Sequence, residues 1–342
     1  MPNIKKKILS EISLATGRYL CQPEFLSLLV TFKCNFRCRS CAVWQKTPAE
    51  ELSAGQWQRI ADNLPKVFSR QTFIEINGGE PLLRYDLTLD LIRNLKRNFD
   101  CVTLNSNGLL IDDVAVSDLE TAGLDAVKIS FYSLNPDIHN ELRGIERAYD
   151  GAKKALELIG QSRMKLEVGI LITAKNIKGI PELIKYLNQS AKISIILQPL
   201  DEKIESRQSK DFQGNDLPRD LWPPAQDVKN LFAWFRAKAK NIKNPPANIQ
   251  AIEEYYLDPE SVLRYRCFAG QRSAVIYPDG DVRLCFKGQP IGNAMSGDLK
   301  KIFNRGERGA TEDQTLPQIL PYHRLQFFPG NKGIFCFVAE DY

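Results

Sequence analysis

Three cysteines lie within eight residues of one another near the start of the chain: Cys34, Cys38 and Cys41. Thiolates at this C-x3-C-x2-C spacing can surround a metal centre from a single loop, and soft sulfur ligands favour zinc or an iron–sulfur cluster. A structural zinc site normally takes four ligands, and no fourth cysteine or histidine is close in the sequence. A cluster with three protein ligands leaves one iron open to another group. The triplet alone leaves both kinds of centre open.

Histidine usage narrows the chemistry further. The chain has only His139 and His323, and neither has a second histidine nearby. A histidine-rich zinc site therefore lacks ligands, and a Ser-His-Asp triad would have to use one of these two side chains. We expect neither kind of site.

A second polar motif is the sequence Gly78-Gly79-Glu80-Pro81. Two successive glycines allow a backbone path that other residues cannot follow, so main-chain groups can approach a ligand closely. The proline then restricts the exit from the turn. Alone, this motif is also typical of an ordinary turn between a strand and a helix, so its meaning depends on what lies beside it.

Short runs rich in β-branched and aromatic residues alternate with longer segments of helical spacing. This order predicts parallel βαβ units, and a partial or full β/α barrel is their natural closure. We expect strands over Leu26–Thr31, Thr72–Ile76, Cys101–Asn105, Ala126–Phe131, Lys165–Ile172 and Ile193–Leu197. We expect helices over Ala54–Phe68, Tyr85–Asn98, Val114–Ala122, Ala148–Gly160 and Ile180–Asn188. Ser53 and Asp113 are the expected N-caps of the first and third of these helices.

Each polar motif directly follows a predicted strand. The cysteine loop follows the first strand and the Gly-Gly-Glu-Pro turn the second, while residues 105–108 (Asn-Ser-Asn-Gly) follow the third and Ser130 closes the fourth. In a β/α barrel the C-terminal ends of the strands form one face, where the active site lies. We therefore expect these four motifs to converge.

The alternation stops after Leu200. Residues 201–224 are polar and contain three prolines, which is typical of a linker. Helical spacing returns over Ala225–Asn241 and Ala247–Leu257. The segments Ala274–Tyr277 and Val282–Leu284 then flank a Pro-Asp-Gly-Asp sequence that is typical of a hairpin. We expect an N-terminal helical extension at 1–24, the barrel at 25–200, a linker with helices at 201–264 and a small C-terminal α+β module at 265–342.

The composition excludes several classes of protein. With 342 residues, of which 43% are hydrophobic, the chain can bury a substantial core. Its 46 basic and 41 acidic residues give a net charge of +5, too mild to indicate nucleic-acid or membrane partners. No apolar run approaches the roughly 18 residues of a membrane helix, and the N-terminal segment is not typical of a signal peptide. We expect a cytoplasmic protein.

The two motifs together resemble those of radical S-adenosylmethionine (radical SAM) enzymes. The spacing of Cys34, Cys38 and Cys41 matches the cluster motif of that family, and the Gly-Gly-Glu-Pro sequence matches the turn that holds the methionine amine. The resemblance runs from about Phe25 to Leu200. It implies a partial (β/α)6 TIM-like barrel and a four-iron four-sulfur cluster whose open iron binds S-adenosylmethionine. Reductive cleavage of the sulfonium then gives a 5′-deoxyadenosyl radical, which abstracts hydrogen from the substrate.

Three further positions match the family. Ser130 matches a fourth-strand position that often contacts the ribose or methionine part of the cofactor. Arg143 matches an arginine that in several members pairs with the methionine carboxylate, which a guanidinium can bind through two hydrogen bonds. Asn107 lies where the family has a Thr-Asn-Gly strand end. Each of the three could instead be an ordinary cap or part of a surface salt bridge.

One position departs from the family pattern. Most members have an aromatic residue before the third cysteine to pack on adenine, but this chain has Ser40. Trp44 could supply the stacking surface or could belong to the core.

A second resemblance begins at Cys267. Twelve residues separate it from Gly280, and four more precede Cys285, as at the start of the twitch or SPASM module that carries an auxiliary cluster in many radical SAM enzymes. The alternative is that two cysteines flank a hairpin by chance. Only Cys336 remains downstream, so one option is an auxiliary cluster held by these three cysteines with an open iron.

The tail suggests another option. Residues 305–310 read poorly as a continuation of the short helix expected at 297–304. Leu316-Pro317 and Leu320-Pro321 lie four residues apart, and a leucine codon ending in TG followed by a proline codon contains TGC one base later. In that frame both pairs become cysteines at C-x3-C spacing. We expect that the tail beyond about residue 305 is frame-shifted and cannot complete the auxiliary cluster.

The expected function is that of a radical SAM enzyme with a peptide or small-molecule substrate and an electron donor such as flavodoxin or ferredoxin. Related two-module enzymes modify peptides, dehydrogenate sugar alcohols or cyclise nucleotides. Only about 25 residues precede the first strand, which argues against an added N-terminal peptide-recognition domain, and the chain lacks the Gly-Gly tail of the molybdenum-cofactor cyclase. The alternative is a non-catalytic iron–sulfur or metal-binding protein that keeps the fold.

Overall fold

The computed structural model describes residues 12, 23–41, 43–46, 50–200, 219–259, 261, 273–286, 288–296 and 298–305. Within them, nine strands form one sheet in the order β6-β5-β4-β3-β2-β1-β7-β8-β9. The strands are β1 (Phe25–Leu29), β2 (Phe73–Asn77), β3 (Cys101–Ser106), β4 (Ala126–Ser130), β5 (Lys165–Leu171), β6 (Ile193–Gln198), β7 (Ser273–Ile276), β8 (Asp281–Arg283) and β9 (Gly292–Asn293). The helices are α2 (Ala54–Asn63), α3 (Tyr85–Lys96), α4 (Asp113–Ala122), α5 (Pro136–Arg143), α6 (Ala148–Gln161), α7 (Ile180–Leu187), α8 (Ala225–Lys238), α9 (Pro246–Leu257) and α10 (Leu299–Arg305). No helix in these ranges is long and apolar enough to cross a membrane.

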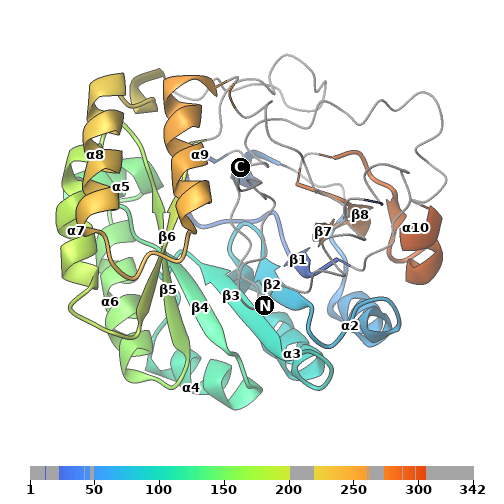
Figure 1. Ribbon diagram of the computed structural model, residues 1–342. Coiled ribbons are helices and arrows are strands. Elements are labelled where there is room, and N and C mark those ends of the chain that lie inside the picture. The colour runs from blue at the N-terminus through green and yellow to red at the C-terminus, as the bar shows by residue number, and fades with distance from the viewer. Residues whose placement is uncertain are drawn as a thin grey trace.

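Strands β1 to β6 are parallel and follow one another across the sheet in chain order. Helices connect the successive strands and cover the outer face of the curved sheet (Figure 1). This arrangement confirms the expected partial (β/α)6 barrel. It also brings the C-terminal ends of the six strands to one edge of the sheet.

Alternation along the strands separates a helix-covered face from a concave face. In β1, Leu26 and Leu28 are fully buried in the main hydrophobic core, whereas Ser27 points the other way. Each of the covering helices contributes fully or almost fully buried apolar side chains to that core, including Trp57 of α2, Ile92 of α3, Leu119 of α4, Ile159 of α6 and Ile184 of α7. The core therefore fixes the sheet from outside and leaves the concave face for other contacts.

Local signals explain most of the element bounds. Ser53 caps α2 with a capping box, in which Gln56 N donates to Ser53 Oγ (3.3 Å) and Ser53 N donates to Gln56 Oε1 (2.8 Å). The expected long first helix ends at Asn63 because a short 3-10 turn that contains Pro65, Leu64–Lys66, follows it. The N-cap of α4 is Asp112, not the expected Asp113: its Oδ1 accepts from Ala115 N, since the helix begins one residue earlier than predicted.

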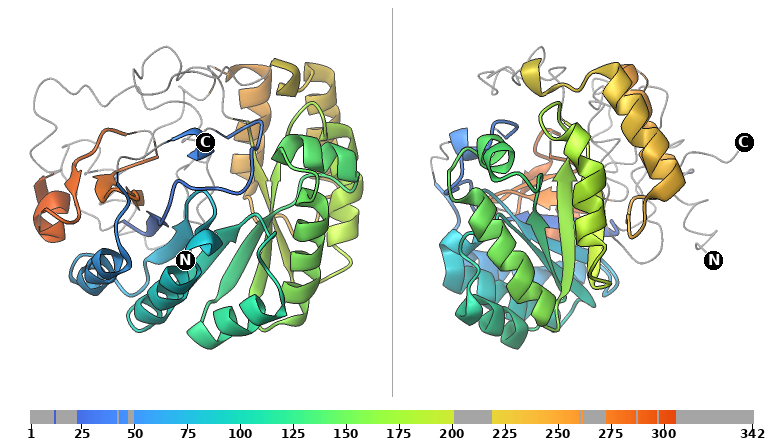
Figure 2. Two further views of the ribbon diagram at one scale, coloured as in Figure 1. Left: turned by 180° about the vertical axis from the view of Figure 1, so that it is seen from behind. Right: turned by 90° about the vertical axis from the view of Figure 1, so that its left-hand side faces the viewer.

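Additional elements lie at both edges of the barrel sheet. Helices α8 and α9 lie beside β6, and β7, β8 and α10 lie on the side of β1 (Figures 1 and 2). The expected hairpin is present, with β7 and β8 antiparallel, but β7 also pairs in parallel with β1. The second module therefore continues the barrel sheet. The expected part boundaries at residues 24, 200 and 264 adjoin or fall in segments outside the described ranges and stay predictions.

Candidate functional site

The cysteine loop follows β1 and places its three thiols among apolar side chains. Cys34, Cys38 and Cys41 belong to one packed cluster with Phe36 of the same loop and three neighbours from other segments: Leu109, Ile145 and Ala148. Phe36 N also donates to the Cys34 sulfur at 3.4 Å. These contacts surround the thiols with apolar side chains.

Burial changes the acidity of these thiols. It raises the pKa of Cys41 to about 11, and the neighbouring Cys38 adds to the shift. Burial also raises the pKa of Cys34. Because metals bind thiolates, loading of this loop must release protons from the cysteines.

The Gly-Gly-Glu-Pro turn lies directly against the loop that leads to the cysteines. Gly79 N donates to Thr31 O at 2.7 Å, and Glu80 N donates to Lys33 O at 2.9 Å. A Cβ atom on Gly79 would overlap the main-chain carbonyl of Lys33, so only glycine permits this approach. Gly78 and Pro81 flank this contact, at the end of β2 and at the start of the next 3-10 turn.

Glu80 braces the turn against the end of β3. Its fully buried carboxylate accepts from Leu82 N (3.1 Å), Ser106 Oγ (3.0 Å) and Asn107 N (2.8 Å). Burial raises the pKa of Glu80, although these three hydrogen bonds oppose the shift. The side chain therefore joins two strand ends.

Asn107 connects the end of β3 to the cysteine loop. Its Nδ2 donates to Asn35 Oδ1 at 2.7 Å, and its own Oδ1 accepts from Leu109 N at 3.0 Å. The strand includes Asn105 and Ser106, one residue further than predicted. Ser130 ends β4 as expected, and its side chain is partly exposed at the same edge of the sheet.

Helix α5, which is not among the helices predicted from the sequence, holds the other side of the cysteine loop. Arg39 N donates to Leu142 O in its last turn at 3.1 Å. Gly144 follows the helix with a φ of 72°, and a Cβ there would overlap the carbonyl oxygen of Arg37. The sequence signals were Asn135, which caps the helix, and Pro136 at its first position, but eight residues make a short periodic segment.

Arg143 ends α5 and is almost fully buried beside the thiols. Its Nη1 donates to the Tyr132 hydroxyl at 3.0 Å, and its guanidinium lies over the rings of Phe36 and Tyr132 at 5.1 Å from each centroid. Burial alone would lower the pKa of Arg143, but the three cysteines and Tyr132 raise it overall. The guanidinium is therefore a buried cation that faces the cysteine loop.

A four-charge network ties the cysteine loop to its surroundings. Arg39 pairs with Glu141 of α5 and with Asp220, at 2.9 Å from Arg39 Nη2 to Asp220 Oδ1. Lys175 contacts the same two carboxylates at 3.2 and 3.4 Å. Positive and negative charges thus alternate among these four side chains, all of which are partly exposed.

The concave face of the barrel carries polar and charged side chains. Lys128 of β4 donates to Glu75 of β2 at 2.8 Å, and both side chains are at most 15% exposed. The buried polar atoms Ser27 Oγ and Asn105 Oδ1 have no hydrogen-bond partner in the described structure. Such atoms usually have hydrogen-bond partners in folded proteins.

Trp44, the alternative stacking residue, contacts the loop itself. Its indole Nε1 donates to Cys38 O at 3.4 Å, and the Arg37 guanidinium lies 5.1 Å from the ring centroid. Trp44 therefore has one face toward a cation and is only partly buried.

The auxiliary site is described in part. Cys285 is buried just after β8, while Cys267 and Cys336 lie outside the described residues, as does the tail beyond 305. Tyr277 links the two cysteine regions: its ring packs on Phe32 at 5.9 Å between centroids, and its hydroxyl donates to Phe286 O at 2.5 Å.

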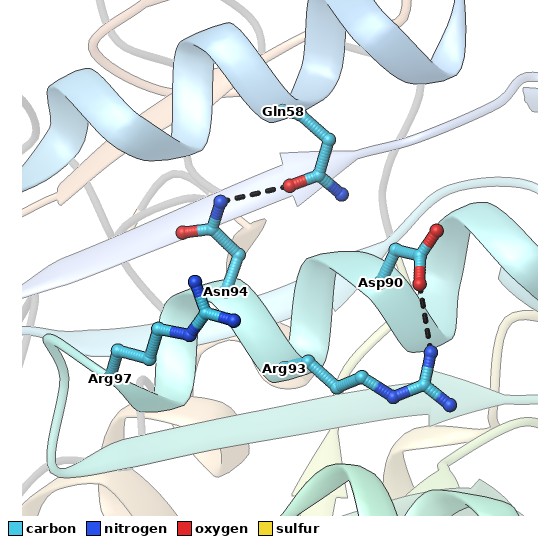
Figure 3. Close-up of a pocket in the computed structure, with 5 residues that line it drawn as sticks. All are labelled: Gln58, Asp90, Arg93, Asn94 and Arg97. Carbon is cyan, nitrogen blue, oxygen red and sulfur yellow. Dashed lines mark hydrogen bonds and ion pairs between the residues drawn. The ribbon is translucent and has the colours of Figure 1, made fainter.

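A small surface hollow of about 200 Å³ lies elsewhere, between α2 and α3 (Figure 3). Its lining side chains largely bond to one another: Asn94 donates to Gln58 and Arg93 to Asp90, both at 2.8 Å. It contains no residue singled out by the sequence. The strand-end region is therefore the candidate site.

Comparison with protein families decides the identity of this region. Residues 28–187 match the model of the Radical SAM superfamily. The matched segment includes the cysteine loop, the glycine turn and Arg143. These residues are a radical SAM domain. Residues 267–319 match an iron–sulfur cluster-binding domain, SPASM, which confirms the resemblance of the second module.

Two curated relatives match different lengths of this chain. A probable GTP 3′,8-cyclase of Methanopyrus kandleri is 32% identical over 175 residues, which is 51% of this chain and 54% of that protein. The mycofactocin maturase MftC of Mycolicibacterium smegmatis is 25% identical over 275 residues, which is 78% of this chain and 65% of that protein. The chain thus spans about half the length of the cyclase.

Solved structures share the fold. Streptococcus suis SuiB bound to S-adenosylmethionine aligns with a TM-score of 0.65 at 17% identity, covering 88% of this chain and 71% of SuiB. The structure of anSMEcpe with bound AdoMet aligns with a TM-score of 0.63 at 17% identity, covering 84% and 82%.

Family membership implies a four-iron four-sulfur cluster and S-adenosylmethionine, and the SPASM domain implies an auxiliary cluster. The residues present fit the first of these groups. Cys34, Cys38 and Cys41 lie in one packed cluster, and three thiolates can each bind a different iron of a four-iron cluster. The buried, unpaired Arg143 Nε beside them suits an anionic ligand.

Proposed function

We propose that this protein is a radical SAM enzyme that acts on a polar substrate, most specifically a peptide. When bound, the cluster and S-adenosylmethionine supply the reductive cleavage that yields a 5′-deoxyadenosyl radical for hydrogen abstraction. The single observation that carries the proposal is the convergence of Cys34, Cys38 and Cys41 with the glycine turn and the buried Arg143. A non-catalytic iron–sulfur protein would not need that convergence.

The chain's own residues have distinct roles in this proposal. The three thiolates hold the cluster, and the apolar walls around them limit water that would quench a radical. The carboxylate of Glu80 is occupied by protein donors, so the glycine turn contributes its main chain to the methionine amine. Arg143 binds the methionine carboxylate, while Asn107 and Ser130 line the same edge.

The concave face supports a polar substrate. The unpartnered Ser27 Oγ and Asn105 Oδ1 need hydrogen-bond partners, which the amide groups of a peptide can provide. In the register of the sheet, Ser27 lies beside Glu75 and Asn105 lies beside Lys128, and Glu75 and Lys128 form an ion pair. Similarity to a mycofactocin maturase over 78% of this chain, and the fold shared with a SuiB structure bound to precursor peptide SuiA, support a peptide.

A second candidate is nucleotide cyclisation, which the 32% identity to a probable GTP 3′,8-cyclase favours. A triphosphate needs several cations around it. On the described concave face, however, Lys128 is paired with Glu75, and Lys243, which reaches that face from the segment before α9, with Glu167. Because both lysines are already paired with carboxylates, this face favours a peptide substrate over a nucleotide.

The test is the release of 5′-deoxyadenosine by the anaerobically reconstituted full chain. With dithionite and S-adenosylmethionine alone we expect slow release, and release unchanged by GTP. No release from cluster-loaded protein would contradict the enzyme proposal, and stimulation by GTP with a cyclised product would instead establish the second candidate. Reduced flavodoxin and ferredoxin, the proposed physiological donors in the cytoplasm, can replace dithionite in the same assay.

A further inference from the structure

Arg143 is a buried cation that is in no salt bridge within the described structure. One of its N–H groups donates to the Tyr132 hydroxyl, its Nε has no partner, and two aromatic rings enclose it. A buried charge is stable only when other groups replace its lost hydration. The position of the guanidinium therefore depends on the few groups that touch it, and Tyr132 supplies both a ring and a hydrogen bond.

Tyr132 is itself fixed by side chains from two other segments. Its main-chain N donates to His139 Nδ1 at 3.1 Å, and its main-chain O accepts from Asn176 Nδ2 at 2.8 Å. Asn176 is locked in turn, because its Oδ1 accepts from Thr173 N at 2.8 Å. Both polar main-chain groups of Tyr132 are thus held, so its hydroxyl has a defined position.

The imidazole of His139 is suited to this supporting role. The side chain is fully buried, and its ring lies between 5.2 and 6.1 Å from the rings of Phe131, Tyr132 and Tyr149. Burial lowers the pKa of His139 to about 3, so the ring stays neutral and Nδ1 stays an acceptor at neutral pH.

We propose that Tyr132 is a positioning residue for the cofactor: its hydroxyl orients Arg143 so that the remaining guanidinium N–H groups bind the methionine carboxylate of S-adenosylmethionine. This inference rests on the proposed function, because it needs the carboxylate as the ligand of Arg143. Tyr132 carried no signal in the sequence, since a tyrosine after a strand is typical of ordinary core.

The test compares two variants that each lose one hydroxyl. Tyr132→Phe keeps the ring over Arg143 but removes its hydrogen bond. Tyr149→Phe removes a hydroxyl from a ring that also packs on His139 and that, in the described structure, has no hydrogen bond to Arg143. Binding of S-adenosylmethionine to the cluster-loaded full chain is measured by equilibrium titration. We expect about a tenfold rise in Kd for Tyr132→Phe, as for one hydrogen bond to a charged group, and an unchanged Kd for Tyr149→Phe.

Three more measurements separate positioning from a structural defect. Iron per chain and the spectrum of the reduced cluster without S-adenosylmethionine should equal those of the wild type, and the cleavage rate at saturating cofactor should be retained. A Tyr132→Phe variant that binds the cofactor as tightly as the wild type, while Arg143→Ala binds weakly, would overturn the inference and leave the proposed function intact. Loss of iron in Tyr132→Phe would also overturn it. A wild type that binds no S-adenosylmethionine would overturn the proposed function itself.

Discussion

The two cysteine-bearing regions differ in how the rest of the chain holds them. The loop with Cys34, Cys38 and Cys41 is bonded to the turn after β2, to the end of β3 and to the last turn of α5. Cys285 follows a single hairpin, with Gly288 N donating to its carbonyl at 3.2 Å. Spacing alone suggests a ligand set in both regions, but only in the first does the described structure show a cysteine loop held by several distant segments. Changes to the first region should therefore have the larger effects.

The largest effect is expected from removing the first ligand set. Changing Cys34, Cys38 and Cys41 together to Ala should abolish the release of 5′-deoxyadenosine, because no thiolate remains on the loop to hold the cluster. Cys101→Ala is the matched control, since Cys101 is also a partly buried thiol but lies at the far end of β3. A triple variant that cleaves S-adenosylmethionine at the normal rate would contradict the assignment of this loop.

We expect the second region, around Cys285, to hold no iron. If the tail is frame-shifted, the reconstituted chain holds about four irons instead of about eight, and Cys285→Ala leaves that number unchanged. Resequencing the gene tests the cause, because the codons of Leu316 and Leu320 must end in TG. Two intact clusters in this chain, or other leucine codons, would contradict the frame-shift prediction.

The close approach of α5 to the cysteine loop predicts a loss of stability in Gly144→Ala. The left-handed backbone and the overlap with Arg37 should lower the free energy of unfolding by about 1–3 kcal/mol, and iron should be lost more readily. Gly160→Ala is the matched control: this helical glycine has open space around it, so alanine should raise stability by up to about 1 kcal/mol. Equal denaturant midpoints for the two variants would show that the contact with the loop is unimportant.

The smallest predicted effect concerns pH and the helix that supports the first region. The pKa of His139 is about 3 in the folded chain and about 6.5 when unfolded, so the unfolded chain binds the proton more tightly. This difference stabilises the fold fully above pH 6.5 and is lost as the pH falls toward 3. Between pH 6.5 and pH 5 the loss is about 2 kcal/mol, which His139→Gln should avoid. Denaturant unfolding at both pH values checks this, and equal pH slopes would contradict it.

Much of the fold and site could be predicted because the relevant signals are local. Alternating strand and helix patterns gave six parallel strands within one or two residues of their bounds, and hydrogen bonds join the cysteine loop, the glycine turn and the end of β3 as expected. Pro65 limited the first helix, a signal present in the sequence but outweighed by the apolar periodicity up to Phe68. Asp112 and Asp113 are the same type of residue and could each cap a helix, so only the position at which α4 begins shows which of them is the N-cap.

The rest depends on contacts between distant segments. Nothing in the segment around residue 273 indicates that it pairs with β1, because strand pairing depends on which edge is free in the folded sheet. The ion pair of Glu75 and Lys128 joins two strands that are not neighbours, and the role of Tyr132 arises only once α5 places Arg143 against it.

The pairing of β1 with β7 also has a consequence for how the chain is made. β1 precedes the other described strands in the chain, and its second neighbour β7 is synthesised only after the other five barrel strands and helices α8 and α9. Until then the apolar strand Phe25–Leu29 has one unpaired edge, which is a template for aggregation. A pairing between such distant segments also forms slowly. Expression of a barrel fragment that stops before β7 should therefore yield more insoluble protein than expression of the whole chain.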